Sequence, residues 1–262
     1  MVLHNYNLVV INSSAGKDSL CALWEVSRLA KEQNYPLNNL IVSHQDLGES
    51  EWPGVKELAK IQADLFGLKI YYSKRRNKKG QEETLLEYVR RRGKWPSSSQ
   101  RYCTSDFKRG PGARVVTALT KNFKTSKILY VFGFRKEESP SRSKKKELEI
   151  NRQLTTKKRK VYNWLPIHTW TEEKVWETIK SNKLPYHKAY DLGMPRLSCC
   201  FCIFSPFDAL VLAGKENPEL LQHYVDTEEK IGHTFKNGSS IKSVKEAIDS
   251  DYEPKKIKNW RM

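Results

Sequence analysis

The 262-residue sequence has few cysteines, no long apolar run and no surplus of acidic residues. No stretch approaches the roughly 18 apolar residues of a membrane span, and residues 1–6 lack the charged and apolar regions of a signal peptide. These absences predict a cytoplasmic protein with no membrane partner. Five cysteines in a reducing compartment argue against a disulfide framework and leave reduced thiols, metal ligation or catalysis as their roles.

Positive charge is in clear excess. Lys and Arg number 47 against 30 Asp and Glu, which gives a formal net charge of +17. The bias is local, since residues 74–114 hold 13 basic and 4 acidic side chains, and residues 135–160 hold 11 and 4. Such a field favours a polyanionic partner. A lysine-rich proteome with solvated charged faces would give a similar composition, so a nucleic-acid partner is a hypothesis at this point.

Short apolar runs alternate with segments of helical periodicity. The runs cover residues 8–11, 40–43, 68–72 and 128–132, and the helix-like segments cover 19–32, 54–66, 82–92 and 111–121. This alternation predicts an α/β fold with a doubly wound, mostly parallel sheet whose ligands lie at the carboxyl ends of the strands.

A change of pattern near residue 170 suggests two parts. We expect a nucleotide-binding α/β domain over residues 1–170. Residues 171–262 would form a smaller C-terminal lobe with a cysteine cluster and helices near 206–215, 217–231 and 241–249. The mostly polar residues 136–160 are predicted to be a mobile, basic flap.

A phosphate-binding loop is predicted between the first strand and the first helix. Its sequence is Ser14-Ala15-Gly16-Lys17-Asp18-Ser19. Small residues at a strand-to-helix turn let backbone N–H groups approach an anion, and the helix presents its positive dipole end to the same point. Lys17 adds a cation, Ser14 and Ser19 add hydroxyl donors, and the spacing is not that of a Walker loop. A small-residue turn with an N-cap is the alternative interpretation.

Two further segments follow predicted strands. Asp46-Leu47-Gly48 comes after the second strand, and Gly133 to Ser139 closes the fourth. Gly133 would let the backbone approach a nucleotide, while Arg135 could hold a phosphate through its planar fork, with Glu138 orienting an arginine. Asp18 could help to place a metal ion, or it could simply complement the helix dipole. Taken alone, Asp46 could be an N-cap and Arg135 a surface charge.

The cysteines form a third constellation. Cys103 stands alone, whereas Cys199, Cys200 and Cys202 lie together nearly a hundred residues later. Thiolates at i and i+3 can grip one metal centre, and a remote third thiolate can complete most of a cluster site. Zinc, a redox dithiol and buried apolar thiols remain open alternatives. Cys21, within the first helix, is expected only to pack.

These motifs resemble those of one family over residues 6–205. The SxGKDS loop, the Asp46-Leu47-Gly48 element and the Gly-Phe-Arg-x-x-Glu-Ser segment are similar to those of PP-loop ATP pyrophosphatases of the phosphoadenosine phosphosulfate (PAPS) reductase-like branch. The resemblance implies an adenine nucleotide alpha hydrolase-like fold. It also implies a nucleotide site formed by Ser14 to Ser19, Asp46, Gly133 and Arg135. In many members cysteines at the places of Cys103, Cys199 and Cys202 ligate a [4Fe–4S] cluster, while Cys200 is an additional thiol that could be the fourth ligand or a reactive group. Leu47 replaces the usual Thr.

The expected function depends on one feature in which this sequence differs from the PAPS reductases that it resembles. A PAPS reductase needs a nucleophilic cysteine near its C-terminus, and no cysteine follows Cys202 here. The combination with positive charge most resembles the ATP pyrophosphatase of DNA phosphorothioation systems. That group implies ATP cleavage to AMP and pyrophosphate, Mg²⁺, a DNA substrate, a cysteine desulfurase as sulfur donor and other modification-system subunits. Lys17, Asp18 and Arg135 would be its catalytic residues. A tRNA thiolase, an unusual sulfonucleotide reductase and a nucleotide-dependent nucleic-acid-binding module without turnover are the alternatives.

Overall fold

The computed structural model describes residues 1–123, 126–236 and 238–257. Six strands form one sheet: β1 (Leu8–Ser13), β2 (Leu40–Gln45), β3 (Lys69–Ser73), β4 (Ser126–Val131), β5 (Leu148–Ile150) and β6 (Arg159–Trp164). Their order across the sheet is β3-β2-β1-β4-β6-β5, and every neighbouring pair is parallel except β5 and β6. The predicted mostly parallel α/β sheet is therefore confirmed.

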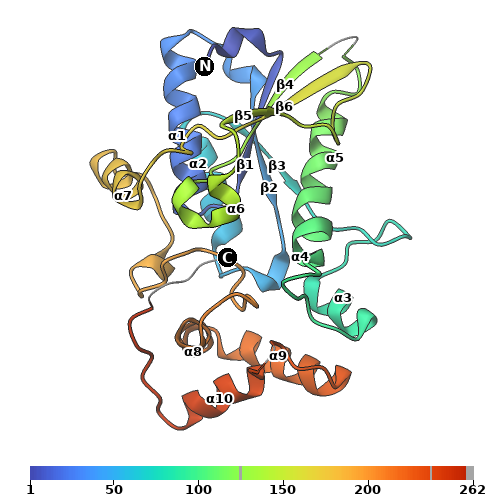
Figure 1. Ribbon diagram of the computed structural model, residues 1–262, viewed down its shortest axis with the longest axis vertical. Coiled ribbons are helices and arrows are strands. Elements are labelled where there is room, and N and C mark those ends of the chain that lie inside the picture. Colours follow the sequence, from blue (N-terminus) through green and yellow to red (C-terminus); the bar gives the residue numbers. More distant parts are fainter. Residues whose placement is uncertain (124–125, 237, 258–262) are drawn as a thin grey trace. The chain divides into compact units, whose positions relative to one another are not determined.

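The alternation of side chains along β1 explains how the sheet is covered. Val9 and Ile11 pack into a core with helix α1 (Lys17–Glu32), whereas Leu8 and Val10 pack on the opposite face with Val116 of α5 (Gly110–Leu119). Figure 1 shows α1 and α2 (Val55–Leu65) on one side of the strands and α5 on the other. A strand buried on both faces reads as a continuous apolar run, which is why the sequence signal of β1 was strong.

The order of the strands reverses at β1. The chain runs outward from β1 to β2 and β3, then returns to place β4 on the other side of β1. Ligands of open α/β sheets bind at such a switch point, outside the carboxyl ends of the two strands. Those ends are Ser13 and Val131, so the segments after them are the predicted phosphate loop and Gly133 to Ser139.

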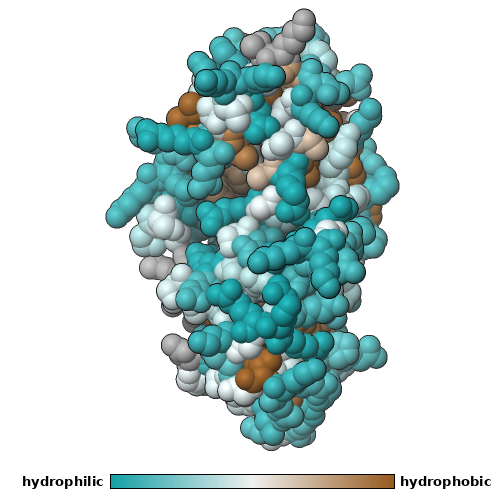
Figure 2. All heavy atoms as spheres, turned by 90° about the vertical axis from the view of Figure 1, so that its right-hand side faces the viewer, coloured by the Kyte–Doolittle hydropathy of each residue, from teal (hydrophilic) through white to brown (hydrophobic). Residues whose placement is uncertain are grey.

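The remaining helices are α3 (Leu85–Arg92), α4 (Tyr102–Thr104), α6 (Pro140–Ser143), α7 (Glu172–Ser181), α8 (Phe207–Glu216), α9 (Pro218–Ile231) and α10 (Ile241–Asp249). None of the helices in the described part of the chain is long and apolar enough to cross a bilayer. On the face drawn in Figure 2 hydrophilic side chains predominate, as expected when 29% of residues are charged.

Two compact units make up the chain. The first unit contains residues 1–45, 54–73 and 111–187, and the second contains 46–53, 74–110 and 188–262. The sequence suggested a single division near residue 170, but both units are discontinuous. The second unit has an aromatic core in which the Trp95 and Tyr224 rings stack at 5.3 Å and Phe235 and Phe201 contact the Tyr224 ring edge or face. Side chains from separate segments thus meet in one core.

The prediction for residues 136–160 was wrong. This segment contains α6, β5 and the start of β6 rather than an unstructured flap. β5 has only three residues and β6 begins with Arg159 and Lys160, so neither shows the apolar run that marked the central strands. Asn151 Nδ2 donates to Asn163 Oδ1 over 3.0 Å, and β5 pairs with β6 through Leu148, Glu149 and Ile150. Pairing with the existing sheet, rather than burial, stabilises this edge.

Candidate functional site

The loop between β1 and α1 is held by its own side chains. Ser13 Oγ accepts a hydrogen bond from the Ala15 N–H over 3.1 Å, and Ser19 Oγ donates to the Gly16 carbonyl over 2.9 Å. Ser19 Oγ also accepts from the Ser14 N–H over 3.2 Å. The Ser19 hydroxyl, which was predicted to meet an anion, therefore also fixes the shape of the loop, together with the Ser13 hydroxyl. Gly16 is the N-cap of α1, so the loop leads directly into the helix dipole.

Ala15 has a left-handed backbone with φ of 56°, which disfavours any residue other than glycine. Gln62 of α2 stabilises this conformation. Its side chain is fully buried, and Nε2 donates to the Ala15 carbonyl over 3.1 Å and to the Pro185 carbonyl over 3.0 Å. Gln62 was not predicted from the sequence, because a glutamine within an amphipathic helix carries no motif signal.

Gly133 follows β4 and lies against the first turn of α1. A Cβ atom at this position would be 2.5 Å from the Asp18 carbonyl oxygen and 2.8 Å from the Ser19 nitrogen. Both neighbours are backbone atoms and cannot move aside easily. From the sequence, Gly133 was expected to let the backbone approach a nucleotide. The structure shows that close packing against the backbone of α1 also requires a glycine at this position. Gly133 lets the end of β4 reach the phosphate loop.

Lys17, Asp18 and Arg135 form one charge group. Arg135 is 3% exposed, and its Nε donates to Asp18 Oδ1 over 2.6 Å while Nη1 donates to Glu137 over 2.9 Å. Lys17 is 2% exposed, and its Nζ lies 3.3 Å from Glu172 and 3.8 Å from Asp18. The group contains two buried cations that a polyphosphate could bridge, with carboxylates that hold the cations in place.

Electrostatics keep Arg135 charged despite its burial. Burial lowers the pKa of the guanidinium, but Asp18 and then Glu138 outweigh that effect, and the pKa lies above its usual value. Glu138 accepts from the Arg135 N–H over 2.8 Å and pairs with Arg142. The expectation that Glu138 orients an arginine thus has a geometric basis.

Asp46 belongs to the second unit, not to the unit that contains the phosphate loop. Its Oδ1 accepts from the Gly48 N–H over 2.8 Å, and Oδ2 lies 3.8 Å from Lys74 Nζ. This is the geometry of a turn-forming aspartate. Its assignment to the nucleotide site remains a prediction.

Three of the four candidate ligand cysteines surround one lysine. Cys199, Cys202 and Cys103 each raise the pKa of Lys108, which follows Cys103 in a π-helical turn over Ser105–Arg109. Cys200 is fully buried, and the neighbouring group that influences its pKa is Cys199, not Lys108. Electrostatics thus couple Cys103, Cys199 and Cys202 to Lys108, whereas Cys200 is coupled to Cys199.

Burial disfavours the thiolate form of two of these cysteines. Burial raises the pKa of Cys199 to about 12, against the opposing charge of Lys108, and burial also raises the pKa of Cys202. Within residues 1–123, 126–236 and 238–257, no three His, Cys, Asp or Glu side chains are arranged to hold a metal ion. The donor set suits a soft metal or an iron–sulfur cluster, but ligation would have to draw the thiols together and release their protons.

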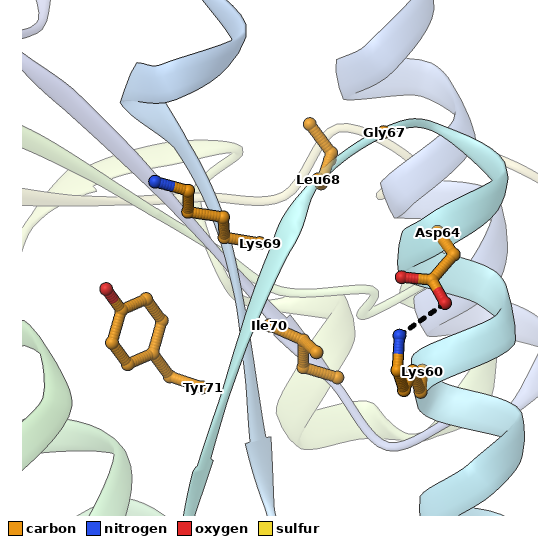
Figure 3. Close-up of a pocket in the computed structure, with 7 residues that line it drawn as sticks. All are labelled: Lys60, Asp64, Gly67, Leu68, Lys69, Ile70 and Tyr71. Carbon is orange, nitrogen blue, oxygen red and sulfur yellow. Dashed lines mark hydrogen bonds and ion pairs between the residues drawn. The ribbon is translucent and has the colours of Figure 1, made fainter.

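A hollow at the edge of the first unit has no part in this chemistry. It is lined by Lys60, Asp64, Gly67, Leu68, Lys69, Ile70 and Tyr71, and Figure 3 shows Lys60 paired with Asp64. Lys69 is the first residue of β3 and pairs with Ile41, the second residue of β2. The hollow thus lies toward the amino end of the edge strand, whereas the phosphate loop follows the carboxyl end of β1.

Comparison with known families decides the assignment. Residues 8–205 match the model of the phosphoadenosine phosphosulfate reductase domain. The chain belongs to this family. The match begins at the first residue of β1 and ends three residues after Cys202, so it includes the phosphate loop, Arg135 and all four candidate ligand cysteines.

Relatives of this PAPS reductase domain protein differ in how much they share with it. An uncharacterized protein of Methanocaldococcus jannaschii is 26% identical over 217 residues, which cover 82% of this chain and 40% of that protein. An adenosine 5′-phosphosulfate reductase of Oceanobacillus iheyensis is 41% identical over 73 residues, 28% of each chain. The chain thus spans less than half the length of these relatives.

Solved structures agree on the fold. The PAPS reductase of Candida auris, crystallised as a phosphate complex, superposes with a TM-score of 0.51 at 18% identity, covering 75% of this chain and 83% of that one. Candida glabrata FMN adenylyltransferase superposes with a TM-score of 0.50 at 13% identity, covering 75% and 56%. Both share the PP-loop nucleotide alpha hydrolase-like fold with this chain.

The last described residues lie outside the family match. Helices α8, α9 and α10 follow residue 205, yet they pack in the second unit with α3. Glu228 of α9 is buried and accepts hydrogen bonds from the N–H groups of Phe235, Ile241 and Lys242, so it caps α10. These contacts are structural and add no reactive group to the site.

Proposed function

We propose that this protein is an ATP pyrophosphatase that cleaves ATP to AMP and pyrophosphate and thereby activates a DNA phosphate for sulfur insertion in DNA phosphorothioation. The observation that carries the proposal is the group of Lys17, Asp18 and Arg135 at the switch point between β1 and β4. Two buried cations beside a helix N-terminus suit the triphosphate of ATP. The net charge of +17 supports a polyanionic second substrate.

In the first step, an oxygen of the DNA phosphate attacks the α-phosphorus of ATP. A bond forms between them, and the bond from the α-phosphorus to the pyrophosphate oxygen breaks with its electron pair. Lys17 and Arg135 stabilise the negative charge that gathers on pyrophosphate. Asp18 keeps Arg135 in position, and its second carboxylate oxygen, which lies 3.8 Å from Lys17 Nζ, would also bind Mg²⁺, which would neutralise further charge on the leaving group. The products are pyrophosphate and an adenylated DNA phosphate.

In the second step, sulfide attacks the activated DNA phosphorus. The phosphorus–sulfur bond forms as the bond to AMP breaks, and AMP leaves with the electron pair. A cysteine desulfurase with other modification-system subunits would deliver the sulfur as a persulfide, and a thiol reductant would supply the two electrons that release it as sulfide, leaving a disulfide. Cys103, Cys199 and Cys202, with Cys200 as a candidate fourth ligand, would hold a [4Fe–4S] cluster, and this cluster would supply a binding place for inorganic sulfur.

The test is pyrophosphate release from ATP by protein purified without oxygen, with and without DNA. We expect release that depends on DNA and Mg²⁺, and Lys17→Ala should reduce it by at least about a hundredfold because one charge-stabilising donor is lost. Lys60→Ala is the matched control, since Lys60 pairs with Asp64 on the exposed surface of α2. Release that is equal in both variants would exclude the phosphate loop as the site of cleavage.

A sulfonucleotide reductase is the second candidate, favoured by the identity shared with the adenosine 5′-phosphosulfate reductase of Oceanobacillus iheyensis. It predicts sulfite release from adenosine 5′-phosphosulfate or PAPS in the presence of a thiol reductant. ATP would then bind without cleavage. Parallel assays with ATP and both sulfonucleotides distinguish the two functions. Replacing DNA by tRNA in the ATP assay tests the thiolase alternative.

A further inference from the structure

The second unit has a cluster of exposed cations between α3 and Cys103. Arg92 ends α3, Lys94 follows the C-cap residue Gly93, and Arg101 precedes α4. All three side chains are exposed. We call Arg92, Lys94 and Arg101 the basic rim.

The basic rim has a fixed local structure. The Arg92 guanidinium lies 4.9 Å from the centre of the Tyr102 ring, and its Nη2 donates to Gln100 over 3.3 Å. The Tyr102 hydroxyl in turn donates to the Lys94 carbonyl over 2.6 Å. One ring thus joins two members of the basic rim, which reduces the conformational freedom lost when a ligand binds.

Arg101 is held in the same manner next to the second cysteine segment. Its guanidinium lies 4.8 Å from the centre of the Phe204 ring. Tyr102 and Phe204 are the sequence neighbours of Cys103 and Cys202, one and two residues away. The two arginines therefore stack on rings that lie within two residues of Cys103 and Cys202 in the chain.

No member of the basic rim forms an ion pair with a carboxylate in the described part of the chain. The nearby carboxylates have other partners: Glu83 pairs with Arg75 and Arg91, and Asp106 pairs with Arg75 and accepts from Tyr88. Glu87 caps α3 together with Thr84. Arg75 and Arg91 are thus neutralised by carboxylates. Among the residues that the structure describes, the arginines of the basic rim are not.

An arginine stacked on a ring keeps its N–H donors at the edge of the guanidinium plane. Those donors match phosphate oxygens in a bidentate geometry. The basic rim therefore has charge and donors that complement a phosphodiester backbone. Its position next to Cys103 and Cys202 would bring that backbone to the proposed sulfur-handling region.

We propose that Arg92, Lys94 and Arg101 bind the phosphate backbone of the DNA substrate beside the cysteine region. The identity of the polyanion rests on the function proposed above, whereas the surface itself rests on the contacts just described. Each arginine would contact one phosphate and release its counterion. Binding should then depend on salt, with the two arginines accounting for about two units of the slope of log K against log salt.

The test is the fluorescence anisotropy of a labelled 24-base-pair DNA duplex with full-length protein between 50 and 200 mM salt, without ATP. For Arg92→Gln/Arg101→Gln we expect the dissociation constant to rise about tenfold at 100 mM salt and the slope to fall by about 2. The matched control is Lys157→Gln/Lys158→Gln, which removes the same charge from an exposed turn of the first unit. The control should keep at least half of the wild-type affinity. Arg92→Lys/Arg101→Lys tests folding, because it keeps the charge and should keep the slope.

Equal loss of affinity in the Gln variant and in the control would overturn the proposal, as would wild-type protein that binds no duplex at 50 mM salt. Tenfold tighter binding of an RNA of the same sequence would also overturn it. Pyrophosphate release is measured on the same preparations. Protein that binds DNA through the two arginines but cleaves no ATP would contradict the proposed function and support the basic rim as a DNA-binding surface. Protein that cleaves ATP but does not bind DNA through the two arginines would support the proposed function and contradict the proposal for the basic rim.

Discussion

The Nε atom of Arg135 donates to Oδ1 of Asp18 over 2.6 Å, across a separation of 117 residues in the chain. This contact joins the segment after β4 to the first turn of α1. It holds a buried cation at the phosphate loop through contacts within the protein. The arginine is therefore preorganised, and an incoming phosphate would meet a positioned fork rather than a mobile side chain.

Replacing Arg135 should cost both stability and turnover. In Arg135→Met, Asp18 and Glu137 lose their cation, so we expect the free energy of unfolding to fall by about 3 kcal/mol. Pyrophosphate release should fall by at least a hundredfold. Urea unfolding and the ATP assay measure the two effects. Arg28→Met is the control, because Arg28 forms its ion pairs with Glu25 and Glu32 at the surface of α1 and should cost about 1 kcal/mol or less.

Asp18→Asn in the Arg135→Met background should recover part of the lost stability. The second change removes the carboxylate that the first left without its main partner. Activity should not return, since the cation stays absent. If the double variant is less stable than the sum of the two single changes, Asp18 and Arg135 do not form the stabilising pair described here.

Gly133→Ala should destabilise the first unit by about 2 kcal/mol, because the new methyl would overlap backbone atoms of Asp18 and Ser19. Gly112→Ala offers a matched comparison. Its Cβ would be 2.4 Å from the Tyr130 hydroxyl, but that atom ends a side chain that can shift, and alanine favours the α5 helix. Thermal unfolding of both variants should rank Gly133→Ala well below Gly112→Ala.

The stability of the protein should fall at alkaline pH partly through Cys21. Burial, followed by the charge of Asp18, raises the pKa of this thiol to about 12, against about 8.5 in an unfolded chain. Between these values the unfolded chain loses its proton while the folded chain keeps it, so unfolding becomes more favourable as pH rises. Urea unfolding at pH 8, 9 and 10 should show wild type losing stability relative to Cys21→Ser. A gap that stays constant over this range would contradict the raised pKa.

Iron content should separate Cys200 from the other three thiols. If Cys103, Cys199 and Cys202 hold an iron–sulfur cluster near Lys108, replacing any one of them by serine should lower the amount of iron bound after anaerobic purification. Cys200→Ser should retain most of it, because Cys200 is not among the groups around Lys108. Equal loss in all four variants would identify Cys200 as the fourth ligand. Protein without iron in any form would exclude the cluster.

The central strands and the phosphate loop were predictable because burial on both faces and a strand-to-helix turn leave strong local signals. β5 was missed because it is a three-residue edge strand that depends on pairing with its neighbour, and β6 was missed because it begins with two basic residues that interrupt the apolar signal. Cys103, Cys199 and Cys202 were expected to act together, whereas the roles of Gln62 and Lys108 were missed for a related reason. Each depends on contacts between segments far apart in the chain, and no periodicity records them.

The family match ends at residue 205, but the second unit does not. Trp95 stacks on Tyr224, and Arg90 donates to Thr227, so residues beyond the match complete the core around α3. A chain shortened to the matched residues would expose the Trp95 indole and lose the ring beneath Phe201, one residue from Cys202. Protein expressed from the matched residues alone would therefore lack part of the aromatic core that packs against the cysteine segment.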